Sequence, residues 1–188
     1  IGSAYLLGLS LVQNFRTPYF SINPSDFWKR WHISLSSWIR DYIYIPLGGS
    51  KEGLIYSFFI LVFAMTLAGI WHGANYTFLL WGFLWGLYIF IYRIFFCKII
   101  KSNFLMWLIN FIILLILWVI FRSENISFSI KYLMSMFDIF NINNLEFLQR
   151  LNIQNLLLFI SIPFILFLFH YIELILDNKK TLYFIKKN

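Results

Sequence analysis

Four long apolar segments, each close to the length of a membrane-spanning helix, constrain this chain most strongly. A bilayer core about 30 Å thick needs about 20 helical residues. The segments are Leu54–Trp71, Thr77–Phe96, Phe104–Phe121 and Gln154–Leu176. The first three contain no acidic residue, and their one basic residue, Arg93, lies near an end. The sequence therefore predicts an all-α, polytopic membrane protein with about four transmembrane helices.

The composition excludes the main alternatives to a membrane protein. Hydrophobic residues make up 61% of the 188 and charged residues 12%, against about 45–50% and about 25% in soluble domains. The aromatic content of 22% excludes a disordered chain. The single cysteine, Cys97, excludes an internal disulfide framework.

The basic residues predict an orientation in the membrane. If Arg16–Gly53, Arg93–Asn103 and the tail from Asp177 lie inside, 12 basic residues are inside and 3 are outside. This split follows the tendency of lysine and arginine to gather in cytoplasmic loops. The net charge of +7 is therefore assigned to orientation, and we expect no nucleic-acid partner.

The chain starts within an apolar run, Ile1–Val12. This run does not show the pattern of a signal peptide, which is a basic region followed by an apolar stretch and a small-residue cleavage site. We interpret this run as the end of a truncated helix. We therefore expect residues 1–188 to be the C-terminal part of a single membrane domain whose N-terminal part is missing.

The loop after the third apolar segment predicts a helix at the membrane surface. Residues Ile126–Phe140 place four apolar side chains on one face of such a helix. They are Phe128, Tyr132, Leu133 and Met136.

The segment Ser25–Ile45 differs from the apolar segments, because it predicts an amphipathic helix that begins after Asn23–Pro24 and ends at Pro46. Its apolar side carries Phe27, Trp28, Trp31, Leu35, Trp38, Ile39 and Tyr42. Its polar stripe carries Ser25, Lys29, His32, Ser36 and Arg40. One interpretation is a helix that lies in the membrane interface, where basic residues contact lipid phosphates. The other is that the stripe faces a protein cavity in which His32 is functional.

A second polar group lies between the first two apolar segments, in the sequence Gly69–Asn75. An ionisable residue at membrane depth is a functional hypothesis by default, and His72 can exchange a proton near neutral pH. The alternative is a histidine at the interface that makes one backbone hydrogen bond. We interpret Asn75 first as the cap of the next helix.

Two further features receive structural interpretations. His170 lies one turn before Glu173, and we interpret this pair as a polar contact between helices; a proton relay or part of a metal site are the alternatives. Gly82 and Gly86 predict close packing of their helix against a neighbour.

Two sequence runs together resemble the membrane-bound O-acyltransferase (MBOAT) family. They are NFRTPYFSINPSDFWKRWHISLSSWIRDYIYIPLGGS and LAGIWHGANYTFLLWGFLWGLY. The similarity covers about residues 14–88 and is strongest to the bacterial branch that O-acetylates alginate and peptidoglycan. The resemblance implies a multi-pass protein of the bacterial cytoplasmic membrane, and an acyltransferase.

By this resemblance, His72 corresponds to the family's catalytic histidine and His32 to its second histidine. We expect His72 to act as the general base on a sugar hydroxyl. We expect His32, with Ser36 and Arg40, to line the donor side of a passage. An anionic donor is expected to be attracted by the basic residues Lys29, Arg30 and Arg40, with contact to lipid phosphates as the alternative. Asn75 is the last of the candidate binding residues.

The resemblance also implies the partners. The acceptor is expected to be a cell-surface polysaccharide, with an extracytoplasmic acetyltransferase as a possible partner enzyme and membrane lipid around the protein. We expect no bound cofactor, and the acyl donor is acetyl-coenzyme A or an acyl carrier. The competing hypotheses are a transporter or channel subunit with both histidines along its path, and an inactive scaffold fragment.

Overall fold

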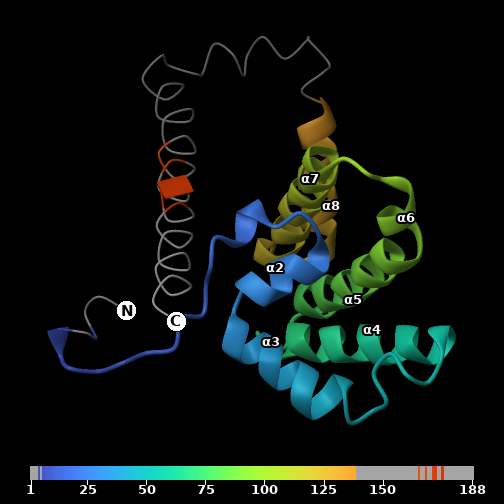
Figure 1. Cartoon of the computed structure of the whole chain (residues 1–188). Helices are drawn as coiled ribbons and strands as arrows, with labels where there is room; N and C mark the ends of the chain where they lie inside the picture. Colours follow the sequence, from blue (N-terminus) through green and yellow to red (C-terminus); the bar gives the residue numbers. More distant parts are fainter. Residues whose placement is uncertain are drawn as a thin grey trace. The chain divides into compact units, whose positions relative to one another are not determined.

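All regular elements in the described part of the chain are helical (Figure 1). The computed structural model describes Ala4, residues 6–138 and five later positions, Ile165, Leu168, Tyr171, Ile172 and Ile175. Its elements are η1 (Pro18–Phe20), α2 (Pro24–Arg30), α3 (Ile33–Ile39), the π-helical turn η2 (Arg40–Tyr44), α4 (Leu54–Ile70), α5 (Tyr76–Ile91), the π-helical turn η3 (Tyr92–Phe96), α6 (Cys97–Ile99), α7 (Asn103–Arg122) and α8 (Ile126–Asp138).

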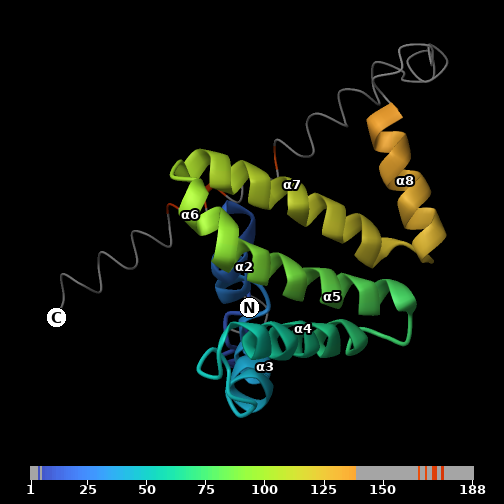
Figure 2. The ribbon, with the colours of Figure 1, turned by 90° about the vertical axis from the view of Figure 1, so that its right-hand side faces the viewer.

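Helices α4, α5 and α7 match the first three predicted apolar segments and lie in one row, with α5 in the middle (Figure 2). Two helices are long and apolar enough to cross a membrane: the 24 residues Tyr76–Ile99 and the 20 residues Asn103–Arg122. Helix α4, with 17 residues, is apolar but shorter. The fourth predicted segment, with His170 and Glu173, lies outside the described residues.

Glycines bring the backbones of α4 and α5 into contact. A Cβ atom added to Gly82 would collide with the backbone of Met65 and lie 2.9 Å from Thr66 Cα. One added to Gly86 would lie 2.6 Å from Val62 Cα, and one added to Gly69 would collide with the backbone oxygen of Phe78. The close packing predicted from Gly82 and Gly86 is therefore confirmed, and α4 and α5 form a tight hairpin.

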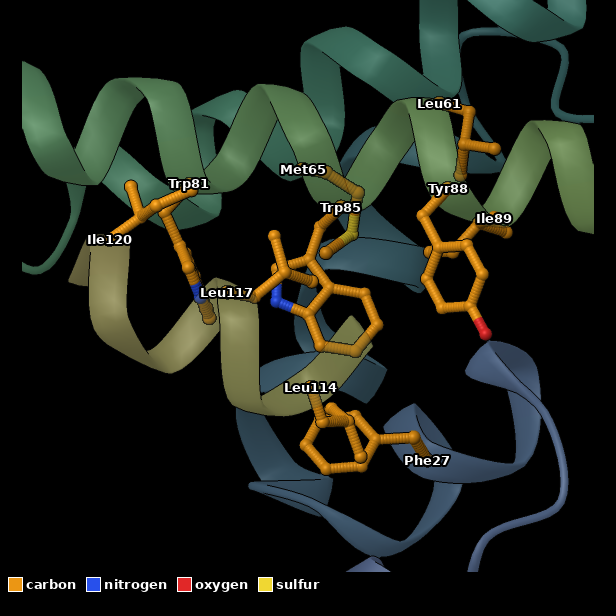
Figure 3. Close-up of a cluster of buried hydrophobic side chains, with 10 residues drawn as sticks. All are labelled: Phe27, Leu61, Met65, Trp81, Trp85, Tyr88, Ile89, Leu114, Leu117 and Ile120. Atoms are coloured by element: carbon orange, nitrogen blue, oxygen red, sulfur yellow. The ribbon is translucent and has the colours of Figure 1, made fainter. Parts of the chain in front are cut away.

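The core lies between α5, α7 and α2 (Figure 3). Trp81 and Trp85, one turn apart on α5, are 1% and 0% exposed. The ring of Phe27 from α2 stacks on Trp85 with ring centres 5.0 Å apart, and Leu114 from α7 is buried in the same cluster. In the first half of the amphipathic segment, Phe27, Trp28 and Trp31 thus pack against protein helices, which contradicts a helix whose aromatic side faces only lipid.

The predicted single helix over Ser25–Ile45 is wrong, because the chain breaks between α2 and α3. His32 has φ 42° and ψ 57°, a left-handed conformation that a right-handed helix does not contain. The polar stripe therefore does not run along one continuous helix. Beyond the break, Ile39 is buried against Ala64 and Ala68, but Trp38 and Tyr42 of the predicted apolar side are exposed.

The segment from His32 to Tyr44 runs from one end of the α4–α5 hairpin to the other. The His32 ring lies 5.9 Å from the Trp71 ring, at the hairpin turn. At the opposite end, the Tyr44 hydroxyl accepts a hydrogen bond of 3.1 Å from Arg93 Nη1. The segment that begins at His32 therefore packs along the hairpin, from the turn that carries His72 to the end near Arg93.

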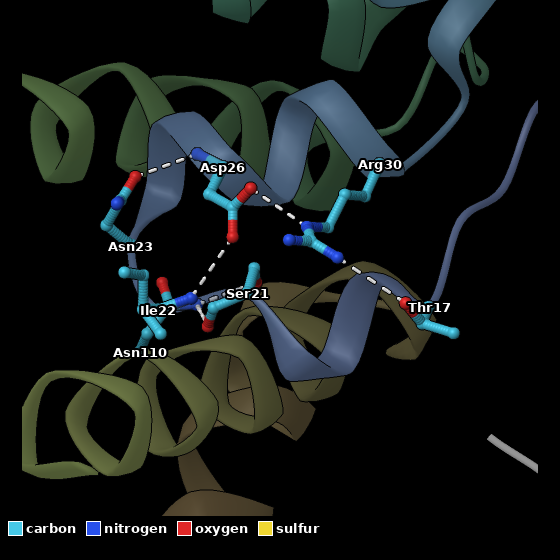
Figure 4. Close-up of polar contacts among 7 residues, drawn as sticks. All are labelled: Thr17, Ser21, Ile22, Asn23, Asp26, Arg30 and Asn110. Carbon is cyan, nitrogen blue, oxygen red and sulfur yellow. Dashed lines mark hydrogen bonds and ion pairs between the residues drawn. The ribbon is translucent and has the colours of Figure 1, made fainter. Parts of the chain in front are cut away.

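A buried amide connects the core to the segment before α2 (Figure 4). Asn110 of α7 is fully buried, and its Nδ2 donates to the Ser21 carbonyl oxygen at 2.9 Å and to Ser21 Oγ at 3.0 Å. Its Oδ1 accepts a hydrogen bond of 2.9 Å from the Tyr88 hydroxyl of α5. One side chain thus joins α5, α7 and the chain before α2.

Replacing Asn110 with leucine is expected to destabilise the protein by about 1–3 kcal/mol, because Tyr88 and Ser21 lose a buried partner. The thermal midpoint of the full-length protein in detergent measures this effect. Asn103→Leu, at an exposed position of the same helix, is the matched control. An equal midpoint for both variants would contradict a stabilising role for the buried amide.

Two sequence predictions near the ends of this region need correction. Within Ile1–Val12, a helix does not continue to Val12: Gly8 has φ 74°, residues 9–12 are not helical, and Leu9, Leu11 and Val12 are exposed. On α8, three residues of the predicted apolar face, Phe128, Tyr132 and Met136, are exposed, but the fourth, Leu133, packs against the core.

Candidate active site

His72 lies in a tight turn whose backbone is fixed from both sides. Its N–H donates to the Gly69 carbonyl at 3.0 Å, and the Gly73 N–H donates to Ile70 at 3.0 Å. Gly73 has φ 150°, and a Cβ there would lie 3.0 Å from the Phe78 ring, so a side chain at this position would be strained. The turn after α4 therefore sets the position of the imidazole.

Asn75 ends this turn in the role predicted for it, as the cap of α5. Its Oδ1 accepts a hydrogen bond of 3.1 Å from Thr77 N–H. Its Nδ2 donates to the Glu124 carbonyl oxygen at 2.9 Å, which ties the turn to the chain after α7. Both polar ends of this amide are engaged by the protein.

Aromatic rings from three helices surround the His72 imidazole. The ring centres of Trp71 and Phe121 each lie 5.0 Å from it, and that of Trp81 lies 5.6 Å from it. Phe78 lies 6.1 Å away. The rings of Phe121 and Trp81 stand at 87° to the imidazole. The histidine is thus half-buried in an apolar corner formed by the end of α4, α5 and α7.

This corner favours the neutral form of His72. Burial lowers the pKa of His72 below its usual 6.5, and the charge of His32 lowers it further. A neutral imidazole at pH 7 has a free nitrogen lone pair and can accept a proton. The surroundings therefore give His72 the protonation state that a general base requires.

His32 lies at the break between α2 and α3, and the Trp71 ring borders both histidines. The Trp71 ring is 5.9 Å from His32 and 5.0 Å from His72, and Phe15 borders His32 at 6.1 Å. The Nδ1 atom of His32 is buried and has no hydrogen-bond partner among the described residues. The structure thus brings together the two histidines that lie 40 residues apart in the sequence.

The other predicted binding residues lie in different surroundings. Arg30 Nε pairs with Asp26 Oδ1 at 2.8 Å, and exposed Arg40 forms two hydrogen bonds to Asp41. Lys29 is exposed. The Ser36 hydroxyl donates to the carbonyl oxygens of Trp31 and His32 at 3.0 and 3.1 Å, so it stabilises the backbone around the break.

The sequence interpretation did not identify the residues that form the walls of this corner. Trp71 contacts both histidines, and its position directly before His72 was the only available signal. Phe121 comes from α7, 49 residues after His72, and no spacing in the sequence indicates this contact. Among the described residues, no group of three or more histidine, cysteine or acidic side chains is arranged to hold a metal ion.

Comparison with known proteins identifies the family. The profile of the membrane-bound O-acyltransferase family matches residues 1–135, more than half of the chain, and this range includes both histidines. The chain belongs to the membrane-bound O-acyltransferase family. The resemblance drawn from the two motifs is confirmed, and membership in this membrane-bound family agrees with the two helices long enough to span a bilayer.

Proteins similar to this chain include three from bacteria. The chain is 39% identical over 158 residues to the Pseudomonas aeruginosa protein named "Probable alginate O-acetylase AlgI", a match covering 83% of this chain and 30% of the relative. It is 38% identical over 166 residues to the "Peptidoglycan O-acetyltransferase" of Helicobacter pylori, covering 81% and 31%. It is 33% identical over 89 residues to the "Teichoic acid D-alanyltransferase" of Bacillus subtilis, covering 44% and 22%. The chain thus spans about a third or less of the length of these relatives.

Proposed function

We propose that this chain contributes the catalytic histidine of an O-acyltransferase that acetylates a cell-surface polysaccharide. The observation that carries the proposal is the half-buried His72, held in a rigid turn with its pKa lowered by the surrounding apolar rings. The names of the alginate and peptidoglycan relatives support a polysaccharide acceptor. The protein is then a multi-pass protein of the bacterial cytoplasmic membrane, in contact with lipid.

In the proposed reaction, the neutral imidazole of His72 removes the proton of a sugar hydroxyl as the oxygen attacks the carbonyl carbon of an acyl thioester. A C–O bond forms and the C–S bond breaks. The imidazolium then returns its proton to the leaving thiolate, so that the histidine is regenerated. The donor is acetyl-coenzyme A or an acyl carrier on the cytoplasmic side, and the protein itself needs no bound cofactor.

His32 is proposed to line the donor side, next to His72. The hydroxyl of Ser36 is engaged by backbone carbonyls, and Arg30 and Arg40 are paired with carboxylates, so we assign the first contact with an anionic donor to exposed Lys29. An extracytoplasmic acetyltransferase is proposed to receive the acyl group where transfer to the polymer is not direct.

The experiment that tests this function measures surface-polysaccharide O-acetyl content in cells that carry or lack the full-length gene. Membranes from both cells are then given a donor with a labelled acetyl group. The proposal predicts that deletion removes O-acetyl groups and that label reaches the polysaccharide only when the protein is present. Uptake of label without its covalent transfer would instead indicate a transporter, and unchanged O-acetyl content would refute the proposal.

The pH dependence of acyl transfer provides a separate prediction. Because the pKa of His72 is lowered, its base form persists at pH 7 and is lost only as the pH falls through a value below 6.5. His32→Asn removes the imidazole that lowers the pKa of His72 by charge repulsion, so the pKa of His72 rises and the acid limb of the rate profile moves to higher pH. Initial rates from about pH 5 to about pH 8 measure this shift. A shift to lower pH would contradict the charge effect of His32.

A further inference from the structure

The break between α2 and α3 is held by a segment that precedes both helices. The Asn14 carbonyl oxygen accepts a hydrogen bond of 3.0 Å from Ile33 N–H, and Asn14 Oδ1 accepts one of 2.9 Å from Ser34 N–H. Two residues later, Arg16 N–H donates to the Arg30 carbonyl oxygen at 2.9 Å. The segment thus bonds to the backbone on both sides of His32.

The bonds from Asn14 replace a helix cap that His32 does not provide. His32 is the N-cap residue of α3, but its side chain makes no capping hydrogen bond. An uncapped helix end leaves N–H groups without partners, and at α3 two of these groups are bonded by Asn14. The imidazole of His32 is therefore free of a capping role.

The backbone is strained at this break and in the segment around Asn14 that is hydrogen-bonded to it. In the described part of the chain, Thr17 and His32 are the two residues other than glycine with positive φ, at 44° and 42°. Arg30 Nη1 donates to Thr17 Oγ1 at 3.5 Å (Figure 4). A left-handed residue other than glycine persists only where its surroundings impose the conformation, and such residues gather at functional sites.

No hydrogen bond from its own side chain fixes the ring of His32 among the described residues. The buried Nδ1 atom has no partner, and the rings of Phe15 and Trp71 border the imidazole. The direction of the ring thus depends on the backbone conformation at the break. Phe15 directly follows Asn14, so the same segment fixes the backbone and contacts the ring.

From these contacts we propose that Asn14 is a positioning residue, which fixes the His32 imidazole beside Trp71 by capping α3 and holding the left-handed backbone at the break. The inference rests on the proposed role of His32 in acyl transfer. Asn14 itself touches no reacting group in this account and acts through His32.

A labelling experiment tests the positioning without reference to activity. The full-length protein in membranes reacts with diethyl pyrocarbonate, and mass spectrometry follows the modification of His32 and His72 in the same molecules. Asn14→Ala is expected to raise the labelling rate of His32 several-fold and leave that of His72 unchanged. Asn14→Asp keeps an acceptor oxygen, and Gln13→Ala removes a side chain that donates to the Phe15 carbonyl oxygen and does not bond α3 among the described residues; both variants are expected to match the wild type. Unchanged labelling of His32 in Asn14→Ala would overturn the inference.

A double-mutant cycle then separates positioning from general stability. Asn14→Ala is expected to lower the acyl-transfer rate per protein by about tenfold to a hundredfold, because the histidine is displaced. In a His32→Asn background, which tolerates the left-handed backbone, the same change is expected to cause no further loss. Equal losses in both backgrounds, or no effect of His32→Asn, would overturn the inference.

The labelling experiment also covers two cases, a variant that does not accumulate and a wild-type protein without measurable acyl transfer. If Asn14→Ala does not accumulate in membranes, Asn14→Gln moves the amide oxygen by one methylene and tests the same contact, with the same expected increase in His32 labelling. If the wild-type protein shows no acyl transfer, the proposed function is refuted, and the labelling comparison still decides whether Asn14 positions His32.

Discussion

Replacing His72 with glutamine is expected to lower the rate of acyl transfer by about 10²- to 10⁴-fold, the usual contribution of a general base. Glutamine is similar in size and keeps hydrogen-bonding groups, but it cannot accept the hydroxyl proton. The turn around position 72 is held by backbone hydrogen bonds and by Asn75, so the fold does not depend on the imidazole. Initial rates with a labelled acyl donor, divided by the amount of full-length protein in the membrane, measure the effect.

The matched control for this variant is Ala74→Ser, an exposed position in the same turn, which is expected to keep the wild-type rate. The acid limb of the rate profile that reports the titration of His72 should also disappear in His72→Gln. A His72→Gln protein that retains a wild-type rate and pH profile would show that the base lies elsewhere in the protein.

Replacing Gly82 with alanine is expected to destabilise the α4–α5 hairpin by about 1–3 kcal/mol, the typical cost of forcing an extra group into a packed core. The added methyl group meets the backbone of Met65 and Thr66, which cannot move aside as a flexible side chain would. Separating the two helices also displaces the turn that carries His72. The amount of folded full-length protein and its thermal midpoint in detergent measure the loss.

Phe83→Leu is the control for this change, because it alters the next residue of α5 at an exposed position. It is expected to leave both the amount of protein and the midpoint unchanged. Equal midpoints for Gly82→Ala and the wild type would show that α4 and α5 can separate without cost, contrary to the contacts described above.

Local signals in the sequence predicted the helices that form the scaffold of the site. Long apolar segments predicted both ends of α7 and the start of α5 to within one residue, because a membrane span must be both long and apolar. The predicted end at Phe96 is the end of the π-helical turn η3, which follows α5. Asn75 was predicted as a helix cap, and its Oδ1 accepts a hydrogen bond from Thr77 N–H. These features depend on neighbours within a few residues, so the sequence contains the information needed to find them.

The break at His32 could not be predicted in this way. The helical spacing of apolar residues continues through Trp31 and Leu35 without a glycine or proline to mark an interruption. The left-handed backbone is imposed by Asn14, which lies 18 residues before His32. The periodicity therefore predicted one helix, although contacts from outside the segment divide it into two.

Contacts between distant segments also determine the surroundings of the site. Asn110 bonds Ser21 from a position 89 residues later, and Phe121 covers His72 from another helix. The motifs identified both histidines by resemblance, but pattern alone gave no sign that one tryptophan ring contacts both of them. Their proximity follows from the packing of α2 and α3 along the hairpin.

The contact between the backbones of α4 and α5 also limits the routes by which substrates can reach His72. At Gly69 and Gly82 the helices approach so closely that even a methyl group does not fit between them. Neither an acyl chain nor a sugar can pass through this seam. In the proposed reaction the hairpin is therefore a fixed wall, and both substrates must approach the imidazole around its end or along its outer faces. The segments that cover those faces, and not the hairpin itself, then determine which substrates are admitted.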